Sequence, residues 1–374
     1  MSEAFDLAIV GAGIVGLAHA LAAARRGLKV VVVERGPRAL GASIRNFGFV
    51  TVTGQAEGGT RRRALRSRQV WEEVAPLAGI AVHQRGALVV ARRPEAREVI
   101  AAYAAGPQGE GCVLYDAIHA RRRWPMLAAG LSGALWSPHE LRVDAREAMP
   151  KLANWLAQAH SVQFRWEISV SGIEGTRLRH AEGAIAADAV VVAPGDGIAA
   201  LAPALARRIV LRSCRLQMLR TVAQPPAFRL DAVLMSDLSL VRYEGFAAQR
   251  PALRLRERLE GEAAEALAHG VHLIVAQGAD GSLVVGDSHE VSDAPHPFSA
   301  ESVDALILDE LDAVLDVSRP GIAERWSGAY PVADVAPVLR ERLGERTVAV
   351  VVTGGTGMST AFALGEETIA ELFG

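Results

Sequence analysis

Three glycines near the start of the chain, Gly11, Gly13 and Gly16, have the spacing of a turn that binds the phosphates of a dinucleotide. They follow a short apolar run and open an alanine-rich segment, as in a β-α-β unit. The first glycine would permit the tight turn, the second a close approach of pyrophosphate to the backbone, and the third close packing of helix on strand. This pattern predicts a nucleotide cofactor.

The residues after the turn strengthen that prediction. The helix that begins at Ile14 and Val15 would direct its N-terminal amides at the phosphate charges. Glu34 ends the next strand, 18 residues after Gly16, where a carboxylate would accept hydrogen bonds from the adenosine ribose.

A second glycine-rich segment, 353–358, lies about 340 residues after the first, between an apolar strand and a helix. An NAD site would normally be completed within one continuous domain, whereas the longer FAD molecule needs contacts from distant segments. FAD is therefore favoured over NAD.

Hydrophobic patterning places the remaining elements and predicts an α/β fold, α+β overall, with two interleaved domains. A Rossmann-like FAD-binding domain is expected over 1–80, 140–210 and 322–374, and an antiparallel-sheet substrate domain over 81–139 and 211–321. Strands are predicted at 7–10, 29–33, 86–91, 162–166, 189–192, 209–221, 239–243, 272–277, 282–286 and 347–352, and helices at 14–26, 61–77, 143–160, 300–315 and 360–372.

Composition excludes several classes of partner. The chain has 374 residues and 40 basic against 42 acidic side chains, so no net field favours nucleic acid or a membrane surface. Only Lys29 and Lys151 are lysines.

Two cysteines suit a reducing compartment, and the acidic N-terminus argues against export, so a cytoplasmic location is expected. His269 and His272 have no carboxylate close in sequence, so no metal site is expected.

The chain resembles the D-amino-acid oxidase superfamily of FAD enzymes, which includes glycine oxidase and sarcosine oxidase. Within it, the chain is similar to a branch associated with phosphonate breakdown, on the segments 43–48, 217–220, 242–246 and 286–290. The superfamily resemblance covers most of the chain and rests on the segments 11–16, 34–35, 41–48, 193–195, 326–337 and 353–360.

FAD is expected to bind noncovalently, because sarcosine oxidase attaches its flavin to a cysteine near the position of Gly328 and this chain has no cysteine there. The resemblance also assigns the FAD contacts. These expected FAD-binding residues comprise the phosphate turn, the adenosine site, the loop beside the pyrophosphate and the loop at the flavin's pyrimidine end. They are Gly11, Gly13, Ile14, Val15, Gly16, Glu34, Arg35, Ser43, Arg45, Asn46, Gly48, Val170, Ala193, Gly195, Gly354, Gly355, Thr356, Gly357, Met358 and Ser359.

Departures from the superfamily pattern bear on the substrate. Where glycine oxidase has a carboxylate-binding arginine the chain has Ala329-Tyr330, and where sarcosine oxidase has a carboxylate-binding lysine it has Ser359. The roof-hairpin lysine that assists oxygen is also missing, because Leu283–Val285 is apolar. Oxidase and dehydrogenase therefore both stay open, with O2 or another acceptor taking the electrons.

Four residues are candidates for the substrate site: Arg45 as an anion-binding group, and Tyr330, His289 and Tyr243 as pocket residues. Because 239–243 is predicted as a strand, Arg242 and Tyr243 should point to opposite faces, so at most one should face the flavin. His272 is a weaker candidate, for which a core or surface position is favoured.

The resemblance implies oxidation of a C–N bond in a small amine, most plausibly 2-aminoethylphosphonate or an N-alkyl derivative. A hydride would pass to flavin N5, and the imine would hydrolyse to phosphonoacetaldehyde and an amine. The alternatives are a glycine- or sarcosine-type amino-acid oxidase, a 2-hydroxyacid dehydrogenase on the same fold, and a noncatalytic flavin-binding subunit.

Overall fold

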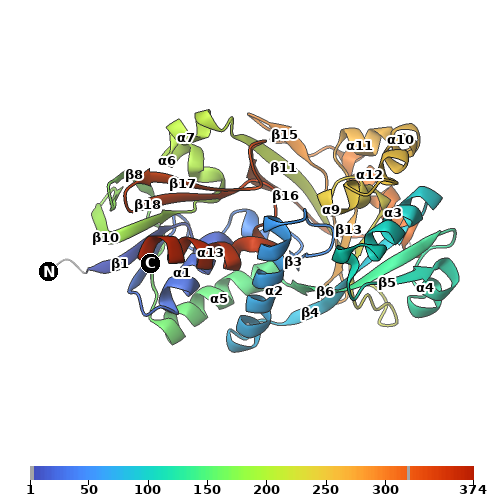
Figure 1. The fold of residues 1–374 in the computed structure, drawn as a ribbon, viewed down its shortest axis with the longest axis horizontal. Coiled ribbons are helices and arrows are strands. Elements are labelled where there is room, and N and C mark those ends of the chain that lie inside the picture. Colours follow the sequence, from blue (N-terminus) through green and yellow to red (C-terminus); the bar gives the residue numbers. More distant parts are fainter. Residues whose placement is uncertain (1–3, 318–320) are drawn as a thin grey trace.

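The computed structural model describes residues 4–317 and 321–374. Two sheets with separate cores divide the chain (Figure 1). The first sheet pairs β10, β1, β2 and β7, as well as β10 and β18, in parallel. In order its strands are β17 (Val338–Gly344), β18 (Thr347–Val352), β10 (Gly183–Val192), β1 (Phe5–Val10), β2 (Val30–Val33) and β7 (Gln163–Arg165), with β8 (Val170–Glu174) and β9 (Arg177–His180) continuing from β10.

The continuous valine run of β2 is explained by burial on both faces of this sheet. Val30 and Val32 join one hydrophobic cluster, while Val31 and Val33 join the cluster on the opposite face. A strand with both faces covered has no need for polar alternation. The helices α1 (Ile14–Ala24), α2 (Gly59–Leu77), α5 (Ala145–His160) and α13 (Gly357–Phe373) belong to the first cluster.

Helices α1 and α13 bring the two glycine-rich segments together in space, although they lie at opposite ends of the chain (Figure 1). Gly365 of α13 lies against the backbone of Ala18 in α1, where a Cβ would stand 2.7 Å from the Ala18 carbonyl oxygen. Gly27, with φ +78°, ends the turn after α1. Helix packing thus places the two glycine-rich segments where one ligand can contact both.

The second sheet is mixed, and it pairs antiparallel except between β12 and β4. In order its strands are β15 (Glu290–Ser292), β11 (Arg212–Thr221), β14 (Leu283–Gly286), β13 (Ile274–Gln277), β12 (Val233–Met235), β4 (Val82–Ala91), β6 (Gly133–Val143) and β3 (Phe49–Val50), with β16 (Ile322–Val332) on β11 and β5 (Val113–Asp116) on β6. The remaining helices are α3 (Pro94–Ala105), α4 (Ala117–Arg123), α6 (Ile198–Leu201), α7 (Pro203–Arg208), α8 (Asp237–Leu240), α9 (Glu244–Ala247), α10 (Ala252–Glu262), α11 (Ala264–Ala268) and α12 (Glu301–Val314).

The mixed α/β class expected from the sequence is confirmed, but the strand predicted at 239–243 is wrong. The segment forms the end of α8 and a turn into α9. Asp237 is fully buried and accepts hydrogen bonds from the backbone N–H groups of Arg92 and Arg93 and from the Arg93 guanidinium. This anchored helical turn replaces the extended backbone that the local alternation suggested.

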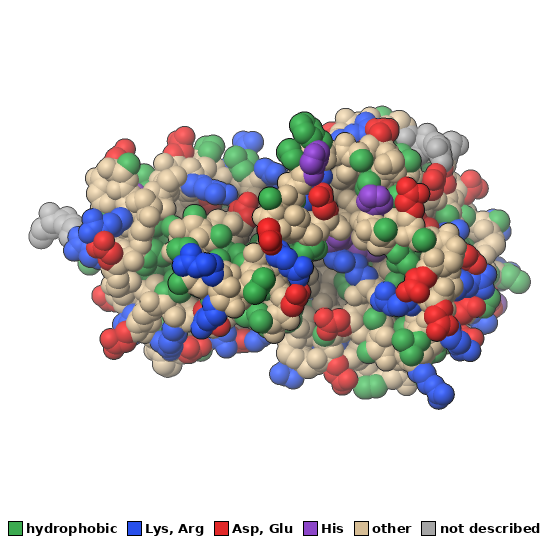
Figure 2. Space-filling model, turned by 90° about the horizontal axis from the view of Figure 1, so that it is seen from above, with side chains coloured by type: hydrophobic (Ala, Val, Ile, Leu, Met, Phe, Trp, Pro, Cys, Tyr) green, Lys and Arg blue, Asp and Glu red, His purple; other side chains and the backbone are tan. Residues whose placement is uncertain are grey.

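The surface agrees with the nearly balanced charge. Figure 2 shows basic and acidic side chains interspersed over one face, without a large patch of one sign. No helix among the described residues is long and apolar enough to cross a membrane.

Candidate active site

A cavity of about 800 Å³ runs between the two sheets. One end is lined by Gly11, Glu34 and Val170 of the first sheet and its loops, and the other by Tyr330 and His289. Its length lets one ligand contact both glycine-rich segments and the second sheet. The predicted FAD-binding residues line it, except Gly16 and Gly48, which lie behind its wall.

The phosphate turn is built for close backbone packing. A Cβ at Gly16 would overlap the carbonyl oxygen of Gly11, and Gly11 itself has φ +103°. A Cβ at Gly13 would stand 3.0 Å from the hydroxyl oxygen of Ser43. That hydroxyl accepts a hydrogen bond from the N–H of Ile14, which ties the loop at 41–48 to the start of α1. The requirement for glycine is therefore visible at each position.

The carboxylate of Glu34 organises the adenosine end. It accepts hydrogen bonds from the N–H groups of Ala12 and Gly36, at 2.9 and 3.0 Å. Arg35 pairs with Asp196 across 3.1 Å, and both side chains are exposed. A carboxylate has about four acceptor positions, so Glu34 retains capacity for ribose hydroxyls.

The start of α13 has a buried hydroxyl without a hydrogen-bond partner, which suits the polar edge of a flavin ring. The buried hydroxyl of Thr356 has no hydrogen-bond partner, although it lines the cavity. Gly355 has φ +69°, and a Cβ there would lie 3.1 Å from Cζ of Tyr330. Ser359 instead serves the fold, because its Oγ accepts from the N–H of Thr51. The residues present therefore fit FAD along the length of the cavity.

The side chain of Arg45 stabilises the loop at 41–48 through hydrogen bonds. Its guanidinium donates to the carbonyl oxygens of Leu40 and Ser327, at 2.9 and 3.2 Å, and the residue is exposed at the cavity's edge. Asn46 likewise holds the loop, since its side chain donates to the Ala42 carbonyl and accepts from the Gly48 N–H. These bonds favour a structural role for both residues.

Arg242 is better placed than Arg45 to bind an anion. Its Nη2 lies 3.5 Å from the hydroxyl oxygen of Tyr330, and both residues line the cavity. Across the described parts of the chain, no carboxylate lies within ion-pairing distance of its guanidinium. Tyr243 lines the cavity too, so the expectation that only one of Arg242 and Tyr243 faces it is wrong. The turn between α8 and α9 allows both.

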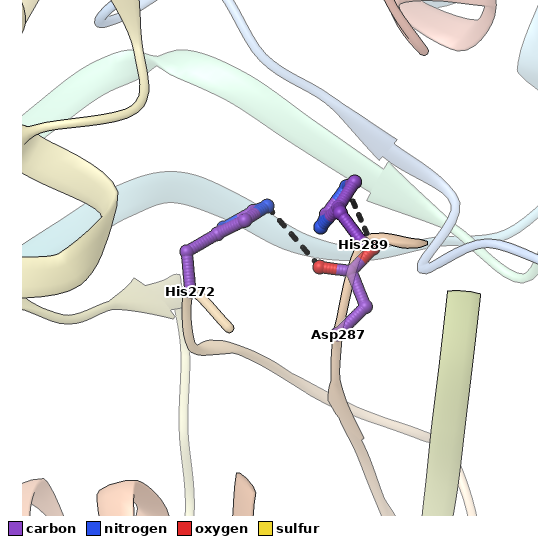
Figure 3. A group of neighbouring side chains, drawn as sticks. All are labelled: His272, Asp287 and His289. Carbon is purple, nitrogen blue, oxygen red and sulfur yellow. Dashed lines mark ion pairs between the residues drawn. The ribbon is translucent and has the colours of Figure 1, made fainter. Parts of the chain in front are cut away.

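Three buried side chains, His272, Asp287 and His289, meet at the same end of the cavity (Figure 3). Nε2 of His272 lies 3.2 Å from Oδ1 of Asp287, and Nε2 of His289 lies 3.7 Å from Oδ2. The two imidazole rings stack, with centroids 4.9 Å apart. The cluster unites the segment before β13 with the segment after β14.

Burial governs the protonation of this cluster. It raises the pKa of Asp287 to about 7, and the positive charge of Arg242 opposes that rise. Burial lowers the pKa of His272 and of His289 well below the usual value, and Arg242 lowers both further. Both imidazoles are therefore neutral at pH 7.

The predicted pocket residues Tyr330, His289 and Tyr243 line the cavity, as does the weaker candidate His272, whereas Asp287 was not predicted. His272 lines the site rather than lying only in the core. Its carboxylate neighbour is Asp287, which the pairing of β13 with β14 places beside it. Asp287 stands in the segment 286–290 that carried the resemblance, and its position directly after a strand was the available signal.

Comparison with known proteins adds a family and a fold. A family model described as FAD dependent oxidoreductase matches residues 6–371. No curated protein sequence matches the chain. Among solved structures, the chain is similar to glycine oxidase from Bacillus cereus ATCC 14579, with a TM-score of 0.79 and 19% identity over 98% of this chain and 94% of that one.

Two further structures share the fold. L-proline dehydrogenase from P. horikoshii has a TM-score of 0.76 and 20% identity, over 100% of this chain and 94% of that one. Iminodiacetate oxidase from Chelativorans sp. BNC1 has a TM-score of 0.71 and 18% identity, over 98% and 94%. At such identities these likenesses concern the fold alone.

Proposed function

The chain belongs to the family of FAD-dependent oxidoreductases, and from that premise we propose that it oxidises the C–N bond of a small amine that carries an anionic group. The observation that carries this proposal is the guanidinium of Arg242, which lines the cavity beside Tyr330 without a carboxylate partner among the described residues. A cation held in this way at a cavity wall is suited to an anionic ligand group.

The protein would bind FAD noncovalently, and the bound FAD would supply the two-electron oxidation. The phosphate turn, Glu34 and the start of α13 would hold its two ends, and the unpartnered hydroxyl of Thr356 would hydrogen-bond to it. The residues of the chain would orient the substrate and bind its anionic group and its amine.

The anion we propose is a phosphonate, and the substrate 2-aminoethylphosphonate or an N-alkyl derivative, giving phosphonoacetaldehyde and ammonia or an amine. The resemblance of 43–48, 217–220, 242–246 and 286–290 to the phosphonate-associated branch supports this. So does Tyr330, which stands directly before Pro331, where the amino-acid oxidases of the superfamily have an arginine.

The second candidate is a glycine-type amino-acid oxidase. The fold shared with glycine oxidase and iminodiacetate oxidase favours it, and Arg242 would then bind a carboxylate. Substrate identity separates the two candidates, because the site would be the same.

The test is to load the purified protein with FAD and follow the visible flavin absorbance without oxygen. Loss of the absorbance with 2-aminoethylphosphonate or its N-methyl derivative, but not with glycine or sarcosine, is the expected result. Loss with glycine or sarcosine alone would establish the second candidate. Repeating the reaction in air decides whether O2 or another acceptor takes the electrons.

A further inference from the structure

The hydrogen bonds of His289 determine which of its ring nitrogens carries the proton. Nδ1 of His289 lies 3.0 Å from the carbonyl oxygen of Gly270, which only accepts, so Nδ1 is the protonated nitrogen and Nε2 presents a lone pair. Nδ1 of His272 lies 3.5 Å from the hydroxyl oxygen of Ser239, which also lies 3.3 Å from the carbonyl oxygen of Leu273. Because that hydroxyl can donate or accept, either ring nitrogen of His272 can carry its proton.

Nε2 of both rings faces the carboxyl group of Asp287, which only accepts when it is ionised. Nε2 of His272 and of His289 lie 3.2 and 3.7 Å from the oxygens of Asp287, and the ligand atoms of the three side chains all lie within 4.8 Å of one another. Oδ1 of Asp287 is buried without a hydrogen bond. Each of the three side chains is at most 7% exposed, and all three line the cavity. When Asp287 is ionised, its Oδ1 and Nε2 of His289 are therefore acceptors in need of a donor.

Buried acceptors that lack a donor are stabilised by a cation, and an ammonium group and a divalent metal are the two kinds that fit. The positive charge of Arg242 favours the ammonium group over the divalent metal. That charge influences the pKa of all three residues, so it would repel a divalent ion about twice as strongly as an ammonium. The rings of Tyr243 and Tyr330 stand edge-on to His272 and His289 and add aromatic walls. Aromatic rings also favour an organic cation.

We propose that Asp287, His272 and His289 form the subsite that binds the substrate's ammonium group, and that Asp287 takes one of its protons. This proposal rests on the proposed function, in which the substrate is an amine. The ammonium nitrogen gives H⁺ to a carboxylate oxygen of Asp287, so R–NH3⁺ and –COO⁻ become R–NH2 and –COOH. No electrons move in this step, and the neutral amine is the form whose C–N bond can be oxidised.

The charged and titratable groups around Asp287 are compatible with this exchange. Arg242 supplies the positive charge that acts on Asp287, while Tyr243, Tyr330 and Cys214 have their pKa values raised by burial and stay neutral. Arg242 and Asp287 then form a pair of opposite charges in one cavity wall, matched to a substrate with an anion at one end and an ammonium at the other.

The two carboxylate oxygens of Asp287 and Nε2 of His289 can accept from an ammonium that retains several N–H donors. A primary ammonium offers three, a monomethyl ammonium two and a dimethyl ammonium one. The subsite therefore selects primary or singly alkylated amines, and affinity should fall with each N–H that a methyl group replaces.

The experiment is calorimetric titration of the FAD-loaded protein with methylammonium, trimethylammonium and tetramethylammonium, and separately with methylphosphonate. Affinity should fall along the cation series in the unmodified protein. In Asp287→Asn, methylammonium affinity should fall by about 30-fold or more, because a buried charge partner is lost, while methylphosphonate affinity is retained. Asp293→Asn, an exposed matched control, should bind both ligands normally.

Two results would overturn the subsite: equal binding of methylammonium and tetramethylammonium by the unmodified protein, or a stoichiometric divalent metal in the purified protein. The cation series needs no variant, so it decides the question even if Asp287→Asn does not fold. Failure of the proposed function would appear differently, as normal methylammonium binding without loss of flavin absorbance on adding any amine.

Discussion

The guanidinium of Arg242 lies 3.5 Å from the hydroxyl oxygen of Tyr330, although 88 residues separate the two in sequence. Arg242 belongs to the turn between α8 and α9, and Tyr330 to β16. This contact joins the turn between α8 and α9 to β16 at the wall of the cavity. The guanidinium of Arg242 and the hydroxyl of Tyr330 are therefore the groups that we propose contact the substrate's anion.

Replacing Arg242 by glutamine should weaken the use of anionic amines. Loss of a charge-assisted hydrogen bond is worth about 1.5–3 kcal/mol, so KM for 2-aminoethylphosphonate should rise by roughly 10- to 100-fold. The exposed Arg250→Gln provides the matched control and should behave normally. Steady-state kinetics would count against this assignment if Arg45→Gln raised KM more than Arg242→Gln did.

Replacing Gly13 by alanine should reduce FAD retention. The added Cβ would stand 3.0 Å from Oγ of Ser43, which holds the start of α1 by accepting from Ile14. Gly261→Ala is the control, because it lies inside α10 with open space around it. There alanine should stabilise the fold by about 0.5–1 kcal/mol. The measurement is the ratio of flavin to protein absorbance after gel filtration, and equal ratios in the two variants would contradict the account.

Replacing Asp237 by alanine should destabilise the second sheet. Asp237 is fully buried and accepts from the backbone N–H groups of Arg92 and Arg93, so its removal leaves two buried donors without an acceptor. The Arg93 guanidinium would keep only its pair with Glu262. At about 1–3 kcal/mol for each unsatisfied group, we expect a loss of roughly 2–5 kcal/mol in the free energy of unfolding. Denaturant unfolding measures it, with exposed Glu260→Gln as a control of little effect. A loss as small as that of the control would show that Asp237 does not stabilise the turn at α8.

The pH dependence of kcat/KM should follow the ionisation of Asp287. Its pKa is raised to about 7 by burial, and its charged form is the one that accepts a proton from the ammonium. Activity should therefore rise about tenfold per pH unit below 7 and level off above it, in a step involving one proton. Asp287→Asn should remove that step, and a profile that keeps the step in this variant would assign the ionisation to another group.

Acid precipitation should release FAD into the supernatant, because we expect no covalent bond to the protein. Absorbance of the supernatant and of the pellet gives the result directly. Flavin retained in the pellet would show covalent attachment.

Local patterning predicted the parts of the fold that depend on local physics. The β-α-β unit, the turn at Gly11, Gly13 and Gly16, and the closing helix follow from apolar runs and glycine spacing, although α13 begins at Gly357, three residues before the predicted start. The helical turn at Asp237 could not be predicted this way, because its hydrogen bonds come from Arg92 and Arg93.

The substrate end of the site depends on pairing between distant strands. His272 reaches Asp287 because β13 pairs antiparallel with β14, which aligns the residues just before and just after those strands. The sequence contained each residue but not their proximity, and a lone histidine is ordinarily a core or surface residue. Arg242 and Tyr243 were expected to point to opposite faces, because the local alternation did not reveal the turn between α8 and α9 that lets both line the cavity.

The most direct test of the central claim is the anaerobic flavin absorbance of the FAD-loaded protein during titration with a panel of amines and hydroxy acids. The account predicts loss of absorbance with 2-aminoethylphosphonate or its N-methyl derivative. Loss with a 2-hydroxy acid and with none of the amines would contradict it.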